Sequence, residues 1–294
     1  MSTKKSYVKY ITGLLLFGSN GFVASHIALS SHEIVLLRSC LGTALLAGLF
    51  FASGHRLKTY AQNRKDSLFV ILSGAAMAAD WLLLFEAYQQ IGVSLSILIN
   101  YCGPFIVIAL SPLVLKEKIE GRKIAALVIA FAGVILISGS AAGSGINLHG
   151  LLCAVLSAFA YACMVLANKK SHSVTGMENS MLQLFTTMLV VLIFSLISGR
   201  IPFSIDSDSV FPILWLGLVN TGLGCYLYFS SISSIPAGSV GILGYLEPLS
   251  GVLLSVVLLG ERMTLIQIFG AICILAGAFW GEGIRKKSPI CNKP

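Results

Sequence analysis

Long apolar runs alternate with short polar segments along the whole chain. The hydrocarbon core of a bilayer is about 30 Å thick, so a helix that crosses it needs about 20 mostly apolar residues. Ten runs come near this length, and each predicts one transmembrane helix. They cover residues 10–29, 33–53, 67–88, 94–115, 122–139, 149–168, 179–198, 211–231, 237–257 and 264–283.

The continuity of these runs favours helices over a transmembrane barrel, whose strands alternate apolar and polar residues. The chain is 56% hydrophobic and 11% charged, with a mean hydropathy of +0.88. A soluble domain carries roughly 25% charged residues, because its surface faces water. We therefore expect an all-α integral membrane protein. The net charge of +8 lies in short loops rather than on one soluble face, which argues against nucleic acid as a partner.

The distribution of lysine and arginine predicts the orientation in the membrane. With the N-terminus inside, 17 of the 20 basic residues fall in cytoplasmic segments, whereas Arg38 lies within a span and Arg200 and Arg262 lie in outer loops. Positive charge stays on the cytoplasmic side during insertion. We expect a multi-pass protein of the cell membrane with both termini cytoplasmic and a basic cytoplasmic tail at 284–294.

The chain repeats itself. One shift takes Pro104 to Pro248, and the same shift takes Glu117 to Glu261, Phe17 to Tyr161, Phe85 to Phe229, Tyr101 to Tyr245 and Gly133 to Gly277. The repeats cover residues 9–139 and 149–283. Each holds five spans, an odd number, so the second enters the membrane upside down. Because the repeat needs its first span, this segment is not interpreted as a signal peptide. Inverted repeats are typical of transporters that bind substrate near the midplane.

These motifs resemble the paired EamA units of the drug/metabolite transporter superfamily. The first half carries LLLFGSNGFVASHIAL, VLLRSCLGTALL and NYCGPF followed by LKEK, and the second carries LLCAVLSAFAYACMVLANKK and GYLEPLSGVLLSVVLLGERMTLIQIFGAICILAGAF. The chain departs from the family at Phe17, where tryptophan is usual. The resemblance implies ten helices around a central cavity, with the fifth and tenth spans at the periphery. It implies export of a metabolite without fixing the substrate.

Five spans place a polar or helix-breaking residue at one depth. A helix rises 1.5 Å per residue, which puts Asn20, Asp80, Pro104, Asn220 and Glu247 within a few ångströms of the midplane. Irregular backbone survives at this depth only where it faces protein or water. The coincidence indicates a polar chamber. Each proline either lines it or only kinks its helix for packing.

The predicted spans contain the charged residues Arg38, Asp80, Glu86 and Glu247, and each must pair with another charge, bind a proton or face water. A charged side chain in the bilayer core is costly unless it is paired, protonated or exposed to water. Glu86 lies at a depth similar to that of Arg38, so these two form either a structural ion pair or part of a functional network. Asp80 and Glu247 have no evident cation at their depth. They are either proton-coupling groups or neutral, hydrogen-bonded acids.

Aromatic residues flank the polar belt and indicate the class of substrate. Trp81, Tyr101, Tyr161 and Tyr245 lie deep, whereas Tyr88 and Tyr228 could belong to the membrane interface. Aromatic rings can stack on apolar groups or hold an ammonium group. A nucleotide sugar should need more than one basic residue for its phosphates. An amino acid or similar amphipathic solute fits better.

Other protein classes find less support. A membrane-embedded enzyme would need a nucleophile–base or metal site, and no HExxH, GxSxG or GxGxxG pattern occurs. A channel would not need two exchangeable halves. No cofactor or metal is expected. The small residues of the fifth and tenth spans serve either internal packing or a dimer face, so both a monomer and a homodimer stay open.

Overall fold

The computed structural model describes residues 3–54, 57, 63–91, 96, 99–117, 120–138, 147–199, 205–259 and 265–282, and the regular structure of these ranges is helical. The predicted tail at 284–294, Glu261 and Arg262 lie outside the described residues. The first repeat contains α1 (Thr3–Gly18), α2 (Asn20–Ala24), α3 (Ser31–Ala52), α5 (Arg64–Ile91), α7 (Gly103–Leu115) and α8 (Gly121–Ser138). The second contains α9 (Leu148–Lys170), α10 (Gly176–Ser198), α11 (Ser207–Leu214), the π-helical segment Trp215–Leu223, α12 (Gly224–Ile232), α13 (Ala237–Gly244), α14 (Leu246–Leu259) and α15 (Leu265–Glu282).

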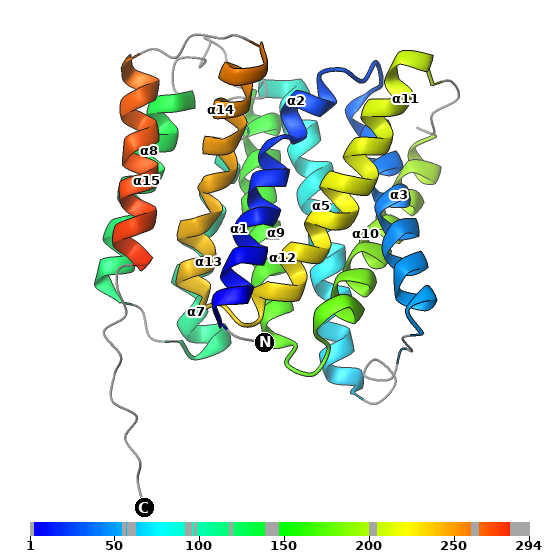
Figure 1. Ribbon diagram of the computed structural model, residues 1–294, viewed down its shortest axis with the longest axis horizontal. Helices are drawn as coiled ribbons and strands as arrows, with labels where there is room; N and C mark the ends of the chain where they lie inside the picture. Colours follow the sequence, from blue (N-terminus) through cyan, green and yellow to red (C-terminus); the bar gives the residue numbers. More distant parts are fainter. Residues whose placement is uncertain are drawn as a thin grey trace, which may run out of the picture.

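The described helices form an upright bundle of ten spans, as predicted (Figure 1). Five helical stretches are long and apolar enough to cross a bilayer unaided: His32–Ala52, Arg64–Ile91, Leu148–Lys170, Gly176–Ser198 and Ser207–Ile232. The first and ninth spans are each built from two shorter helices, α1 with α2 and α13 with α14. Helix α1 begins at Thr3, earlier than predicted, because the polar segment TKKSYVK continues the helix ahead of the apolar run.

The two halves repeat each other in three dimensions. The shift of 144 residues that separates Tyr101 from Tyr245 also takes both ends of α8 to both ends of α15. In Figure 1, α1 starts at the end of the bundle that holds the N-terminus and leads to α2 at the opposite end. Its counterpart α9 runs the other way, because it is the sixth span and α1 belongs to the first. The halves are therefore inverted relative to each other.

The small residues of the fifth and tenth spans pack α8 against α15. A side chain on Gly133 would approach the carbonyl oxygen of Gly270 to 2.5 Å, and one on Gly277 would approach that of Ala126 to 2.7 Å. Such contacts let two backbones approach closely in lipid. Of the two uses expected for these residues, the structure shows internal packing. Large apolar side chains such as Phe279 lie exposed on the outer face of α15.

Candidate functional site

Within the described residues three spans are interrupted, and three residues of the polar belt lie next to these interruptions. The first span breaks at Ser19 between α1 and α2, the fourth at Tyr101 and Cys102 before α7, and the ninth at Tyr245 between α13 and α14. Pro104 and Pro248 stand in the first turns of the helices that follow, where the missing N–H leaves no helical hydrogen bond unmade. These prolines therefore start second half-helices rather than kinking continuous ones.

Two of the interruptions contact each other across the repeats. Tyr101 and Tyr245 occupy equivalent positions, and the Tyr245 hydroxyl donates a hydrogen bond to the Tyr101 carbonyl oxygen at 2.9 Å. Their ring centroids lie 6.0 Å apart. Chain breaks expose backbone carbonyls that need partners in lipid, and this bond satisfies one of them. Tyr161 joins the group from α9, since its ring lies 2.6 Å from the point where a side chain on Gly103 would begin.

The break at Ser19 is held by Asn220. The side-chain amide of Asn220 donates to Ser19 Oγ at 2.8 Å and to Asn20 Oδ1 at 3.0 Å. Asn220 is fully buried and lies in the π-helical segment, where Thr221 Oγ1 bonds back to the Leu216 carbonyl oxygen. Isolated π-helical turns are frequent at functional sites, because they widen a helix locally and redirect its side chains. The two asparagines predicted at the midplane thus meet.

Arg38 reaches the same region from α3. Its Nε donates to Thr221 Oγ1 at 2.9 Å, and its guanidinium carbon lies 4.5 Å from the centroid of the Trp81 ring. Arg38 also interacts electrostatically with Glu247. Only 8% of the residue is exposed. A cation this deep is stabilised jointly by the hydroxyl, the aromatic face and the carboxylate.

Asp80 is buried on α5 and bonded to Asn100. The amide of Asn100 donates to Asp80 Oδ1 at 2.9 Å and to Ser157 Oγ on α9 at 3.0 Å. Asp80 also lies within electrostatic range of Glu247. Sequence reasoning missed Asn100 and Ser157. Asn100 directly precedes Tyr101, so its place beside a predicted break was a usable signal.

Glu247 is the point on which these groups converge. It interacts electrostatically with Arg38, Asp80, Tyr101 and Tyr161, which come from four separate spans. Neighbours on so many sides place its carboxyl group inside the bundle, yet the residue keeps accessible surface, as do Tyr101 and Tyr161. Of the predicted belt residues, Trp81 contacts Arg38, Tyr245 bonds to Tyr101, and Asn220 bonds to Asn20 beside Thr221, the partner of Arg38.

Glu86 lies elsewhere. Its Oε1 is 3.6 Å from His149 Nε2 and accepts a hydrogen bond from Gln90 Nε2 at 3.2 Å. The His149 side chain is 65% exposed, so this pair sits at the rim of the bundle, where α5 ends and α9 begins. Among the described residues no ion pair joins Arg38 to Glu86, so the structural pair considered from the sequence is replaced by the contact with His149. No group of three or more His, Cys, Asp or Glu residues in these ranges could hold a metal ion.

Both halves of the chain match one family of known proteins. Residues 5–139 and 148–280 each match the model of the EamA-like transporter family. The chain is 27% identical over 273 residues to the uncharacterized transporter YxxF of Bacillus subtilis, an alignment that covers 92% of this chain and 87% of the relative. It is 28% identical over 211 residues to a probable amino-acid metabolite efflux pump of Salmonella typhimurium, covering 67% of this chain and 70% of the relative.

The fold also matches a solved crystal structure with a TM-score of 0.81 at 17% identity, covering 94% of this chain and 96% of that one. That likeness concerns the fold alone. The family match spans both halves of the chain, and it agrees with the two inverted five-span repeats. The chain belongs to the EamA-like transporter family, and it is a membrane transporter rather than an enzyme.

Proposed function

We propose that this transporter exports a small amphipathic metabolite carrying amino and carboxyl groups, an amino acid or a close analogue, by alternating access. The observation that carries the proposal is the convergence of Arg38, Glu247 and Asp80 on one partly accessible region at the helix breaks. A substrate carboxylate has a partner in the guanidinium group, which can bind it with two parallel hydrogen bonds. A substrate ammonium group has partners in Glu247 and in the faces of Tyr101 and Tyr161.

The charge balance of the cluster supports coupling to protons. Asp80 and Glu247 contribute two carboxyl groups. Among the described residues, Arg38 is the one cation within electrostatic range of Glu247. Two ionised carboxylates beside one guanidinium group leave an uncompensated negative charge in a region of low dielectric, which is unfavourable. One bound proton removes it. We propose that this proton leaves when substrate binds, so that substrate and proton move in opposite directions.

Two further lines of support concern substrate and direction. The Salmonella typhimurium relative is named a probable amino-acid metabolite efflux pump, which agrees with an amphipathic amino compound moving outward. Lys123 lies in the first turn of α8 and Lys169 in the last turn of α9. Both helix ends lie at the end of the bundle that holds the N-terminus, and the positive-inside rule assigns this end to the cytoplasm (Figure 1). We therefore also propose that the termini are cytoplasmic and that the protein lies in the cell membrane.

Counterflow in proteoliposomes tests this proposal against a channel. Vesicles are loaded with an unlabelled amino acid at high concentration and diluted into a trace of the same compound carrying radiolabel. An alternating-access carrier accumulates label transiently above its equilibrium level, because exchange is faster than net loss. We expect such an overshoot for some members of an amino-acid panel, and its loss in Glu247→Gln and Arg38→Met. Label that only equilibrates, without overshoot, would contradict alternating access and favour the channel.

A further inference from the structure

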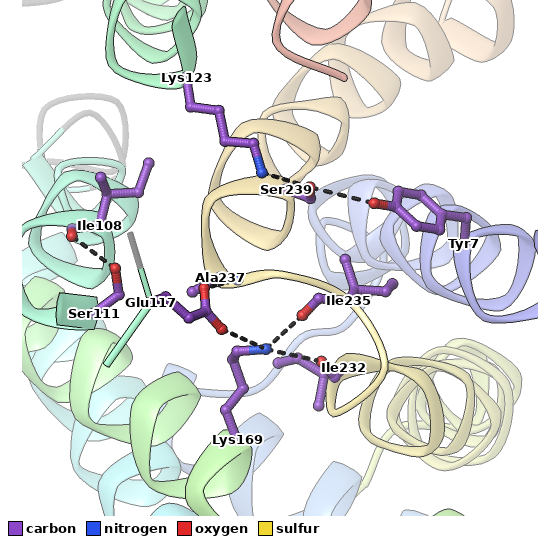
Figure 2. Close-up of polar contacts among 10 residues, drawn as sticks. All are labelled: Tyr7, Ile108, Ser111, Glu117, Lys123, Lys169, Ile232, Ile235, Ala237 and Ser239. Atoms are coloured by element: carbon purple, nitrogen blue, oxygen red, sulfur yellow. Dashed lines mark hydrogen bonds and ion pairs between the residues drawn. The ribbon is translucent and has the colours of Figure 1, made fainter. Parts of the chain in front are cut away.

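A lysine is buried in the last turn of α9, the helix that also carries Tyr161. Only 5% of the Lys169 side chain is exposed. Its Nζ lies 3.7 Å from Glu117 Oε1 and donates hydrogen bonds to the carbonyl oxygens of Ile232 and Ile235. Figure 2 shows the ammonium group at the centre of these partners. A buried ammonium group needs such partners, because an unpaired one would be strongly destabilising.

The carboxyl group of Glu117 is shared between two elements. Oε1 faces Lys169, and Oε2 accepts a hydrogen bond from the backbone N–H of Ala237 at 3.0 Å. Ala237 is the first residue of α13, so Glu117 supplies an acceptor to one of the N–H groups that have no partner within that helix. Glu117 follows the end of α7. One carboxylate therefore ties together the ends of α7 and α9 and the start of α13 (Figure 2).

These contacts cross from one repeat to the other. Glu117 belongs to the first repeat, whereas Lys169 and Ala237 belong to the second. A second polar contact beside them does the same, since Lys123 Nζ and the Tyr7 hydroxyl donate to Ser239 Oγ at 3.4 and 3.3 Å. The ends of α7 and α9 and the start of α13 lie at the end of the bundle that holds the N-terminus (Figure 1). If the repeats move relative to each other, this end can open only when the contacts break.

The opposite end lacks the same lysine. The 144-residue shift places Ser25 at the position equivalent to Lys169. Ser25 is exposed, and its hydroxyl donates to the Phe22 carbonyl oxygen of its own segment. The ammonium group that crosses the repeats at one end therefore has no counterpart at the equivalent position. Inverted repeats alone would make the two closed states alike, and the lysine at only one of the two equivalent positions makes the two ends chemically different.

Water can reach the contact from one side. A cavity of about 300 Å³ adjoins it and is lined by Glu117 and Lys169 together with Lys116, Lys170 and His172. A third of the Glu117 side chain is exposed. Ion pairs of this kind contribute less to stability than well-packed apolar residues would, and their best-attested use is to specify one arrangement over another. Water at the cavity offers both ions alternative partners when the pair separates.

We propose that Glu117 and Lys169 form a latch that closes the transporter at this end and separates once in each transport cycle. The inference rests on the alternating access proposed above. Both are positioning residues, because they act on the arrangement of α7, α9 and α13 rather than on substrate.

Accessibility of a cysteine behind the latch tests the proposal without any substrate. Ser111 is buried on α7, about one and a half turns deeper than Glu117. Its hydroxyl donates to the Ile108 carbonyl oxygen of the same helix, as drawn in Figure 2. The seven native cysteines are replaced, Ser111→Cys is introduced, and membrane vesicles receive an impermeant maleimide from each side in turn. We expect slow labelling with the latch intact. Lys169→Met should raise the rate from the latch side at least about tenfold, since charged hydrogen bonds are lost.

Lys170→Met is the matched control. Lys170 is the next residue, lines the same cavity and contacts the Phe69 ring rather than Glu117, so its loss should leave labelling slow. Lys169→Arg keeps the positive charge and the hydrogen-bond donors, so labelling of the cysteine should stay slow. Glu117→Gln removes the negative charge, so labelling should be fast. Equal rates in Lys169→Met and Lys170→Met, whether both slow or both fast, would overturn the latch. If Lys169→Met does not fold, slow labelling in Glu117→Gln would overturn it. Failed transport would leave these rates intact, so the two proposals fail separately.

Discussion

Gly18 allows α1 to lie directly against α14 beside Glu247, and Gly18→Ala tests this contact. A β-carbon on residue 18 would lie 2.6 Å from the Glu247 carbonyl oxygen and would collide with the Ser250 side chain. Ordinary contact begins at 3.4 Å, so the two backbones would have to separate by about 0.8 Å. Overpacking of this kind destabilises a protein by about 1–3 kcal/mol. The better helix propensity of alanine offsets about 1 kcal/mol at most.

Gly21→Ala is the matched control in the same span. Apart from the neighbouring residues of its own helix, no described heavy atom lies within 4 Å of a β-carbon at this position. Equilibrium unfolding in mixed micelles with rising dodecyl sulfate should show Gly18→Ala less stable than Gly21→Ala by about 2 kcal/mol. Flux in proteoliposomes should fall only in Gly18→Ala, since the shift displaces Glu247. Equal stability and equal flux in the two variants would refute the seating of α1 on α14.

Three further predictions follow from the hydrogen bonds. Asp66→Ala should lower the free energy of unfolding by about 1–3 kcal/mol in the same micelle assay, because the backbone N–H groups of His172 and Ser173 lose their acceptor; wild-type stability would contradict this capping. Asp80→Leu should be less stable than Asp80→Asn, which can still accept from Asn100; the reverse order in that assay would exclude this bond. When Glu117→Lys and Lys169→Glu are combined, the cysteine of Ser111→Cys should react with the maleimide as fast as it does in Lys169→Met, because a glutamate at 169 would face two carbonyl oxygens. Slow labelling would mean that the ion pair alone suffices to keep this end closed.

Much of the architecture was predictable from the sequence, because lipid imposes strict rules on length and backbone pairing. The ten spans, their helical form and the shift that relates Pro104 to Pro248 are all present in the structure. The shift also anticipated where the chain breaks, since the equivalent residues Tyr101 and Tyr245 lie at equivalent interruptions. These two breaks were foreseeable because each precedes a proline by three residues, whereas the break at Ser19 precedes no proline.

The partners of individual side chains were less predictable. Hydropathy gives the depth of a residue but not the face of the helix on which it lies, since lipid and protein interior are both apolar. Depth alone paired Glu86 with Arg38, whereas the structure turns Glu86 toward His149. Lys169 counted only as one of many basic residues at a helix end, and its burial depends on the loop after α12. The π-helical turn at Asn220 left no signal, because packing between helices decides such turns.

Flux against an imposed pH gradient tests the central claim most directly. Proteoliposomes containing the protein are given an amino-acid panel, with and without a gradient, for wild type, Asp80→Asn and Glu247→Gln. We expect wild-type flux to follow the gradient in the direction opposite to the protons and both variants to lose this dependence. Flux in wild type that ignores the gradient and persists unchanged in both variants would contradict it, and it would leave a carrier without proton coupling.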